Sequence, residues 1–174
     1  MNCTKISLAL ALVWGTSLTL AQSVEIGTWA GFRKGAVSFT FDDGPKSDAE
    51  IAAPMFEKYG YRATFNIVTN WVGANGMVSW NDVKTMASAG HEIASHSESH
   101  PGNGAMPSNE ISSSKRVISN NVQQSYGCIT LAYPNCVTPG DQQVLQNYIA
   151  GRICNGSWSG GRSEERRVGK ECRS

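Results

Sequence analysis

The stretch AVSFTFDDGP, Ala36–Pro45, predicts a buried strand that ends in a pair of acids. Its apolar residues alternate with Ser38 and Thr40, which is the period-2 pattern of a pleated strand. The strand leads directly into two adjacent carboxylates, Asp42 and Asp43, and then into a tight Gly-Pro turn. Because ligands bind at the carboxyl ends of strands in α/β folds, we expect the chemistry of the protein to lie here.

Two histidines further along the chain suggest why the acids are paired. Like charges this close repel each other, and a cation between them would relieve the repulsion. His96 and His100 lie four residues apart, directly after a short strand expected at 92–95. Asp42 and Asp43 on their own would fit a helix cap or turn equally well. Together with the histidines, they favour a metal site instead.

The combination of TFDDGP at 40–45 with HSESH at 96–100, each after a strand, closely resembles the polysaccharide deacetylase family. This family is also known as the NodB-homology domain or carbohydrate esterase family 4. The resemblance runs from about Ala36 to about Asn155. It implies an α/β fold, a distorted (β/α) barrel of the glycoside hydrolase and deacetylase type, which is incomplete in this chain.

The resemblance also implies roles for the four residues. Asp43, His96 and His100 match the metal triad of the family, whose usual occupant is zinc, and Asp42 matches the general base. Two neighbours on an extended strand point in opposite directions, so only one of the acids can readily face the metal. The implied activity is hydrolytic removal of acetyl groups from a polysaccharide such as chitin, peptidoglycan or acetylxylan, at carbon–nitrogen but not peptide bonds.

A third family motif, which contains an arginine, a proline and a tyrosine, falls at LAYPNC, 131–136. Only Pro134 matches. Ala132 stands where the family has an arginine that orients the base, and Asn135 stands where it has the tyrosine. The main-chain N–H of Asn135 is still expected to stabilise an oxyanion, because a backbone donor does not depend on the side chain. The alternative is a simple turn at the end of a strand.

Other candidate residues are less specific. Trp71, in the loop after the second expected strand, is the best candidate for a sugar contact, although aromatic residues at strand ends more often pack. His91 does not complete an HExxH motif with His96, so we expect a core or hydrogen-bonded histidine there. Ser97 and Glu98 are expected to support the histidine loop rather than to bind metal.

Strand and helix signals alternate along the rest of the chain, which implies parallel strands joined by helical crossovers. Ser47 and Glu50 fit a capping box at the start of the first helix. Pro54 either kinks that helix or marks its true first turn near Ala53. The remaining strands are expected at 62–68, 92–95, 129–132 and 150–153, and the helices at 47–59, 81–89, 108–122 and 142–148.

Composition divides the chain into four segments. Residues 1–21 read as a secretory signal, with a positive start and a short apolar run, so we expect a secreted protein without a stable membrane span after cleavage. An uncleaved anchor is the alternative. Residues 22–35 form a lead-in, 36–161 a partial deacetylase domain, and 162–174 a densely charged tail typical of foreign sequence.

Charge argues against a nucleic-acid partner. Residues 22–161 carry 9 positive and 11 negative side chains, a difference of −2, without a clustered basic face. The expected partner is therefore an acetylated polysaccharide.

Four cysteines remain after the leader and are disulfide candidates in an exported protein. Cys136–Cys154 is the preferred pair, since both should lie near neighbouring strand ends.

The sequence leaves two functional hypotheses. The first is a metal-dependent polysaccharide deacetylase. The second is a non-catalytic glycan-binding protein or an inactive fragment, because the family protonates its leaving group with a late histidine and no histidine follows His100 here. Loss of general acid catalysis typically costs on the order of 10²- to 10⁴-fold in rate.

Overall fold

The computed structural model describes residues 35–102, 106–136 and 141–153. The chain divides into two units, Met1–Ala36 and Val37–Ser174, and every element described below belongs to the second. The expectations for the leader at 1–21 and for the tail at 162–174 lie outside the described residues. Within the described ranges, no helix is both long and apolar enough to cross a membrane.

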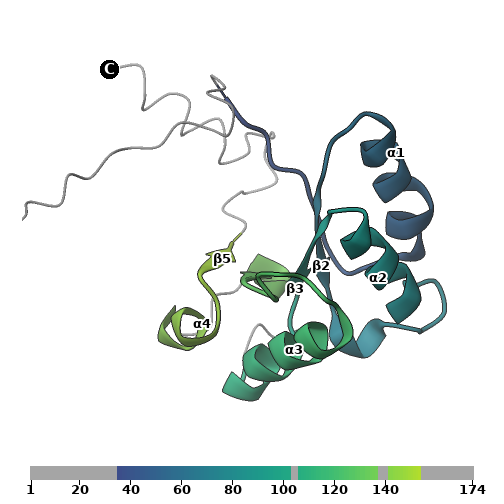
Figure 1. Cartoon of the computed structure of the whole chain (residues 1–174). Coiled ribbons are helices and arrows are strands. Elements are labelled where there is room, and N and C mark those ends of the chain that lie inside the picture. Colours follow the sequence, from purple (N-terminus) through teal and green to yellow (C-terminus); the bar gives the residue numbers. More distant parts are fainter. Residues whose placement is uncertain (1–34, 103–105, 137–140, 154–174) are drawn as a thin grey trace, which may run out of the picture. The chain divides into compact units, whose positions relative to one another are not determined.

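Five parallel strands form one sheet in the order β1-β2-β3-β4-β5 (Figure 1). This confirms the alternation expected from the sequence. The carboxyl ends of all five strands meet at the same edge, because every neighbouring pair runs parallel. The strands are β1 (Thr40–Phe41), β2 (Thr64–Ile67), β3 (Glu92–Ser95), β4 (Thr130–Ala132) and β5 (Ala150–Arg152).

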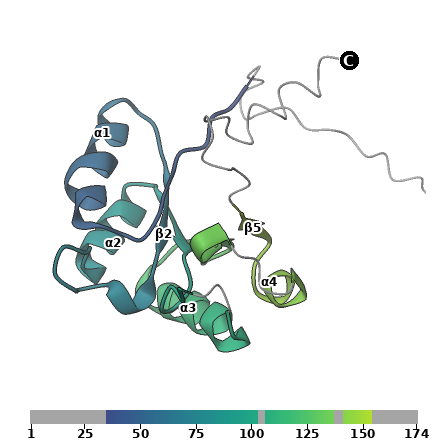
Figure 2. The ribbon, with the colours of Figure 1, turned by 180° about the vertical axis from the view of Figure 1, so that it is seen from behind.

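Helices connect the strands, and α1 and α2 lie on the same side of β2 (Figures 1 and 2). Three short turns accompany them: the π-helical turn η1 (Asp48–Ala52) and the 3-10 turns η2 (Thr69–Trp71) and η3 (Pro134–Cys136). The α-helices are α1 (Ala53–Lys58), α2 (Trp80–Ser88), α3 (Ser108–Asn121) and α4 (Asp141–Asn147).

The start of the first helix differs from the expected capping box. Ser47 already has helical angles, and its side chain makes no capping hydrogen bond, because the chain turns earlier: Asp48 N–H donates to Pro45 O at 2.9 Å. Pro54 lies in the first turn of α1, directly after the π-helical turn η1. The capping box occurs instead before α2, where Ser79 and Asp82 cap each other.

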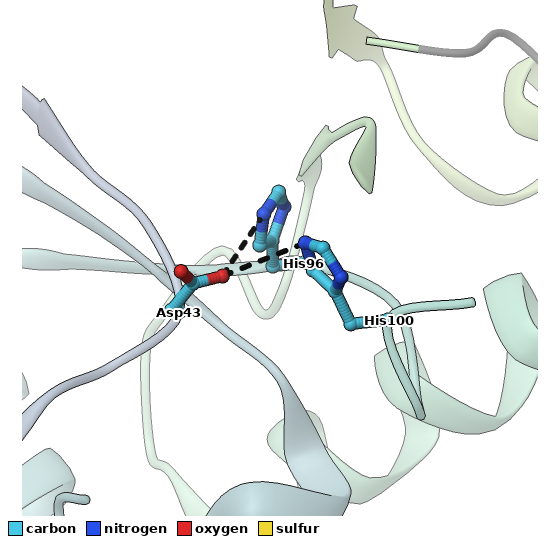
Figure 3. Close-up of side chains that lie close together, drawn as sticks. All are labelled: Asp43, His96 and His100. Atoms are coloured by element: carbon cyan, nitrogen blue, oxygen red, sulfur yellow. Dashed lines mark ion pairs between the residues drawn. The ribbon is translucent and has the colours of Figure 1, made fainter. Parts of the chain in front are cut away.

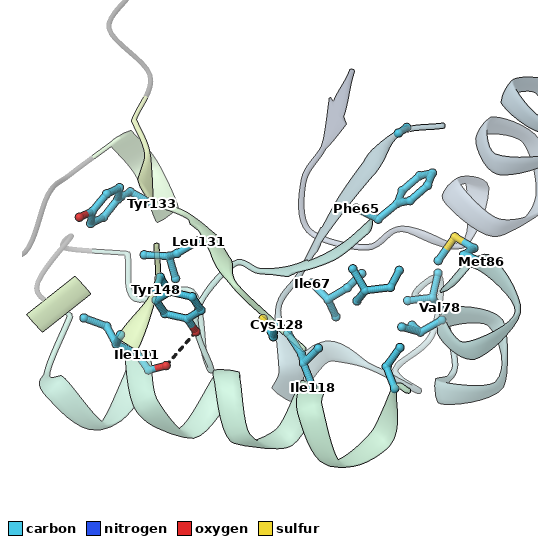
Figure 4. Close-up of a cluster of buried hydrophobic side chains, with 14 of the residues drawn as sticks. Phe65, Ile67, Val78, Met86, Ile111, Ile118, Cys128, Leu131, Tyr133 and Tyr148 are labelled. Atoms are coloured by element: carbon cyan, nitrogen blue, oxygen red, sulfur yellow. Dashed lines mark hydrogen bonds between the residues drawn. The ribbon is translucent and has the colours of Figure 1, made fainter. Parts of the chain in front are cut away.

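A layer of apolar side chains between the sheet and the helices forms the core (Figure 4). Phe65 and Ile67 on β2 and Leu131 on β4 are almost fully buried. Burial of each such side chain stabilises the fold by about 1.5–3 kcal/mol. Tyr148 also lies in this layer, and its hydroxyl donates to Ile111 O at 2.9 Å. The core thus fixes the strands whose ends carry the site.

The cysteines divide into two kinds. Cys128 is a free, buried thiol, and burial raises its pKa to about 12. Its inclusion among the disulfide candidates is therefore wrong, and it behaves as a small apolar core residue. Cys136 is disulfide-bonded, and its partner lies outside the described residues. The pairing with Cys154 stays a prediction.

Candidate metal and catalytic site

Three of the predicted residues converge at the carboxyl edge of the sheet (Figure 3). Asp43 follows β1, and His96 and His100 belong to the loop after β3. The Oδ1 atom of Asp43 lies 3.5 Å from Nε2 of His96 and 3.6 Å from Nε2 of His100. These are one carboxylate and two imidazoles, the donor set expected from the sequence.

The geometry fits a divalent metal. Two ligand atoms that each lie about 2.1 Å from a tetrahedral ion are separated by about 3.4 Å, close to the distances between Asp43 and the two histidines. Asp43 Oδ1 is also buried and has no hydrogen-bond partner. An orphaned buried carboxylate oxygen costs folding free energy unless a cation or donor faces it. The described residues can therefore hold a metal here.

Hydrogen bonding sets the tautomer of His96. Its Nδ1 atom lies 2.8 Å from the carbonyl oxygen of Ala132, so Nδ1 carries the proton and donates it. The lone pair of Nε2 is then free and lies towards Asp43. Burial lowers the pKa of His96, which favours the neutral form that binds metals. The end of β4 thus orients a ligand at the end of β3.

His100 is positioned by a tight turn and an aromatic ring. The main-chain N–H of His100 donates to Ser97 Oγ at 3.0 Å. Its ring stacks on Trp71, with ring centroids 5.2 Å apart and planes inclined by 30°. Trp71 therefore supports a candidate ligand. Its expected sugar contact stays a prediction.

A carboxylate on α3 fastens the histidine loop. Glu110 Oε2 accepts hydrogen bonds from the main-chain N–H groups of Glu98 and Ser99, and Oε1 accepts one from Ser99 Oγ. The Glu98 side chain in turn accepts from Ser113. The expectation that Ser97 and Glu98 support the loop agrees with these contacts.

Backbone strain gathers in the same loops. Gly44 has φ of 77°, and a Cβ placed there would lie 3.1 Å from Ile67 Cδ1, so only glycine fits easily. The non-glycine residues with positive φ in the described ranges all follow β1, β3 or β4, where such angles are unfavourable for L-residues. They are Asp43 (74°), Ser97 (68°), His100 (55°), Asn135 (53°) and Cys136 (62°).

Asp42, the predicted base, has its own set of donors. Asn66 Nδ2 donates to its Oδ1 at 2.8 Å. Arg152 Nη2 lies 2.5 Å from Oδ1 and 2.6 Å from Oδ2. Arg152 is not among the residues predicted from the sequence. The only available signal was its position in the strand expected at 150–153, beside the strand that carries the incomplete third motif.

The third-motif loop contacts the histidine loop in two places. Ala132 O accepts from His96, and Asn135 Nδ2 donates to Pro101 O at 3.2 Å. Pro134 is buried within η3, which ends β4. The structure thus brings Pro134 and Asn135 to the same edge of the sheet as the histidines.

His91 does not join the site. It is buried, its Nδ1 accepts from Ala63 N–H at 3.1 Å, and its Nε2 lies 3.3 Å from Glu57 Oε1. The expectation of a hydrogen-bonded core histidine is confirmed.

One buried acid beneath the site was not expected. Asp48 Oδ2 has no hydrogen-bond partner. Burial, with repulsion from Asp42 and Asp43, raises the pKa of Asp48 to about 7.

A parallel sheet with helical crossovers and a candidate metal centre at its carboxyl edge places the protein among the α/β proteins. The family model described as polysaccharide deacetylase matches residues 30–144, and the chain belongs to this family. The five strands correspond to part of the deacetylase barrel, as expected.

The chain is also similar to solved and curated proteins, two of which are deacetylases by name. Deacetylase PplD of Streptococcus pyogenes, solved in complex with acetate, has 26% identity and a TM-score of 0.64, over 72% of this chain and 58% of that one. The peptidoglycan-N-acetylglucosamine deacetylase of Bacillus cereus is 37% identical over 73 residues, 40% of this chain and 24% of that protein. A gellan lyase of a Bacillus species is 28% identical over 134 residues, 74% of this chain and 5% of that protein. The chain therefore spans only part of the relatives it matches.

Proposed function

We propose that the protein is a secreted, metal-dependent hydrolase that removes acetyl groups from a polysaccharide. The observation that carries the proposal is the convergence of Asp43, His96 and His100 within coordination reach of one ion. Family membership supports the reaction class. The names of the relatives suggest an N-acetylglucosamine glycan such as peptidoglycan; chitin and acetylxylan are further candidates. Zinc is the proposed metal, because two imidazoles and a carboxylate suit it well.

The division of labour follows from the geometry. A divalent ion held by Asp43, His96 and His100 would supply Lewis-acid polarisation of water and of the acyl carbonyl. Asp42, held beside them by Asn66 and Arg152, would accept a proton from the attacking water.

The loop after β4 completes the proposed site. The main-chain N–H of Asn135 would donate to the developing oxyanion. Trp71 would offer a ring face to the sugar next to His100.

Acetate release tests the proposal directly. Purified protein loaded with zinc is incubated with acetylated chitooligomers, peptidoglycan and acetylxylan, and acetate is quantified. We expect release from at least one substrate, and a loss of about 10²-fold or more in Asp42→Asn. Zinc and glycan binding without acetate release would favour the alternative, a non-catalytic glycan-binding protein.

A further inference from the structure

Arg152 contacts the proposed general base from a distant part of the chain. It ends β5, 110 residues after Asp42, and one of its terminal nitrogens lies within hydrogen-bond distance of both carboxylate oxygens. Asn66 donates to the same carboxylate from β2. Asp42 is thus held between donors from two different strands.

The position of Arg152 in the sheet relates it to the incomplete third motif. Ala132 occupies the place where the resemblance expects a base-orienting arginine, and its methyl group is fully buried. Ala132 and Arg152 are register partners on β4 and β5. The guanidinium therefore reaches Asp42 from β5, the strand that neighbours β4, at the level of Ala132.

Local contacts fix Arg152 at this level. Tyr133 N–H donates to Arg152 O at 2.9 Å, one residue beyond the partner Ala132. Gly151 allows the close approach, because a Cβ there would lie 2.7 Å from Tyr133 Cε2. The backbone of β5 thus lies directly against Tyr133, and these contacts fix the main chain from which the Arg152 side chain extends.

The ion pair is poorly explained as a stabilising contact. The side chains of Arg152 and Asp42 are each 38% exposed, and such pairs stabilise a fold by less than about 1 kcal/mol. The Nε atom of Arg152 is buried without a hydrogen-bond partner, which costs free energy. A side chain kept under these conditions is better explained by what it does to Asp42.

We propose that Arg152 is a positioning residue that orients Asp42 from β5, in place of the arginine absent at position 132. The proposal rests on the proposed function, in which Asp42 is the general base. A guanidinium is suited to the task, because it is always charged and can contact both oxygens of a carboxylate. Without it, Asp42 would keep from the described side chains the hydrogen bond of Asn66, which contacts a single carboxylate oxygen.

Kinetics with chemical rescue test the proposal. We expect Arg152→Ala to lower kcat by about 10- to 100-fold, with KM and zinc affinity changed less than about twofold, since Arg152 is not a metal ligand. Guanidinium ion at tens of millimolar should raise the kcat of Arg152→Ala at least about fivefold, whereas sodium chloride at equal ionic strength should not. The matched control is Arg62→Ala, because Arg62 donates to Tyr61 O and makes no contact with Asp42. Its kcat should stay unchanged.

A kcat that is unaffected in Arg152→Ala, or that falls without any rescue by guanidinium, would overturn the proposal. A second readout does not need activity. In crystals of zinc-loaded Arg152→Ala, the Asp42 carboxylate should leave the orientation it has in the wild type and return when guanidinium is soaked in. An unmoved carboxylate contradicts the positioning role, whereas a wild type that binds zinc but releases no acetate contradicts only the proposed function.

Discussion

The imidazole of His96 donates from Nδ1 to the main-chain carbonyl oxygen of Ala132, across 2.8 Å. This contact joins the histidine loop to the end of β4 and leaves Nε2 facing Asp43. Because the acceptor is a backbone oxygen, the contact does not depend on the side chain at position 132. The absence of the third-motif arginine therefore leaves the candidate metal ligands in place and would affect only the proposed base.

The candidate ligands should control zinc binding. We expect His96→Ala and His100→Ala each to weaken zinc affinity by about 100-fold or more, because each removes one of three protein ligands. Titration calorimetry measures the change. The matched control is His91→Gln, which removes a buried histidine outside the cluster and should lower stability but keep one zinc per chain. Unaltered zinc binding in both alanine variants would refute the assignment of the site.

The ring of Trp71 should matter for metal affinity as well. We expect Trp71→Ala to weaken zinc binding by about tenfold, because His100 loses the surface on which it stacks, and supporting residues typically contribute 10- to 100-fold. Trp71→Phe should keep most of the affinity, since it retains an aromatic face. Equal affinities in Trp71→Ala and wild type would show that the turn at Ser97 alone orients His100.

Glu110 should stabilise the histidine loop. Glu110→Ala leaves the N–H groups of Glu98 and Ser99 without their acceptor, and we expect a loss of about 1–3 kcal/mol in the free energy of unfolding. Glu110→Gln keeps a carbonyl oxygen for both groups and should lose less. Urea unfolding of the zinc-free variants gives the comparison, and identical losses in both would mean that the charge matters rather than the acceptor.

Asp48 should make the zinc-free fold less stable at alkaline pH. Its pKa is raised from 3.8 to about 7, so the folded state holds a proton that the unfolded state has lost between these values. The stability that this proton confers is complete below pH 3.8 and disappears as the pH rises through about 7. Asp48→Asn removes the dependence, and its melting temperature at pH 8 should exceed that of wild type by at least about 2 °C.

The comparison at pH 4 provides the control for Asp48, because the folded states of both proteins are uncharged at this position there and the two should melt close together. A melting-temperature difference that is the same at pH 4 and pH 8 would mean that the carboxylate does not titrate as described.

The sequence predicted the alternation of parallel strands and helices, and it placed Asp43, His96 and His100 at strand ends that the structure brings together, because both depend on short-range signals. The alternating apolar residues before Asp42 indicate a strand within a few residues. The two histidines after the strand expected at 92–95 are also a local signal, because they lie only four residues apart. Parallel strands then bring these ends to one edge. The buried, hydrogen-bonded position of His91 was also predicted locally, because His91 and His96 do not complete an HExxH motif.

The remaining features depend on register and turn geometry. Arg152 reaches Asp42 only because β5 pairs with β4 so that position 152 lies beside Ala132. No local pattern reports that alignment. The capping box at Ser47 failed because the turn begins at Pro45, which places Ser47 in helical angles instead of those of a cap. Ser79 has the extended angles that a cap requires.

The left-handed residues that border the site have an implication for protein engineering. Replacement of Ser97 or Asn135 by glycine would relieve backbone strain of about 1 kcal/mol or more at each position. The same substitutions would remove the hydroxyl that holds His100 and the amide that ties the two loops together. Such glycine variants would therefore hold the candidate metal ligand His100 and the neighbouring loop less firmly.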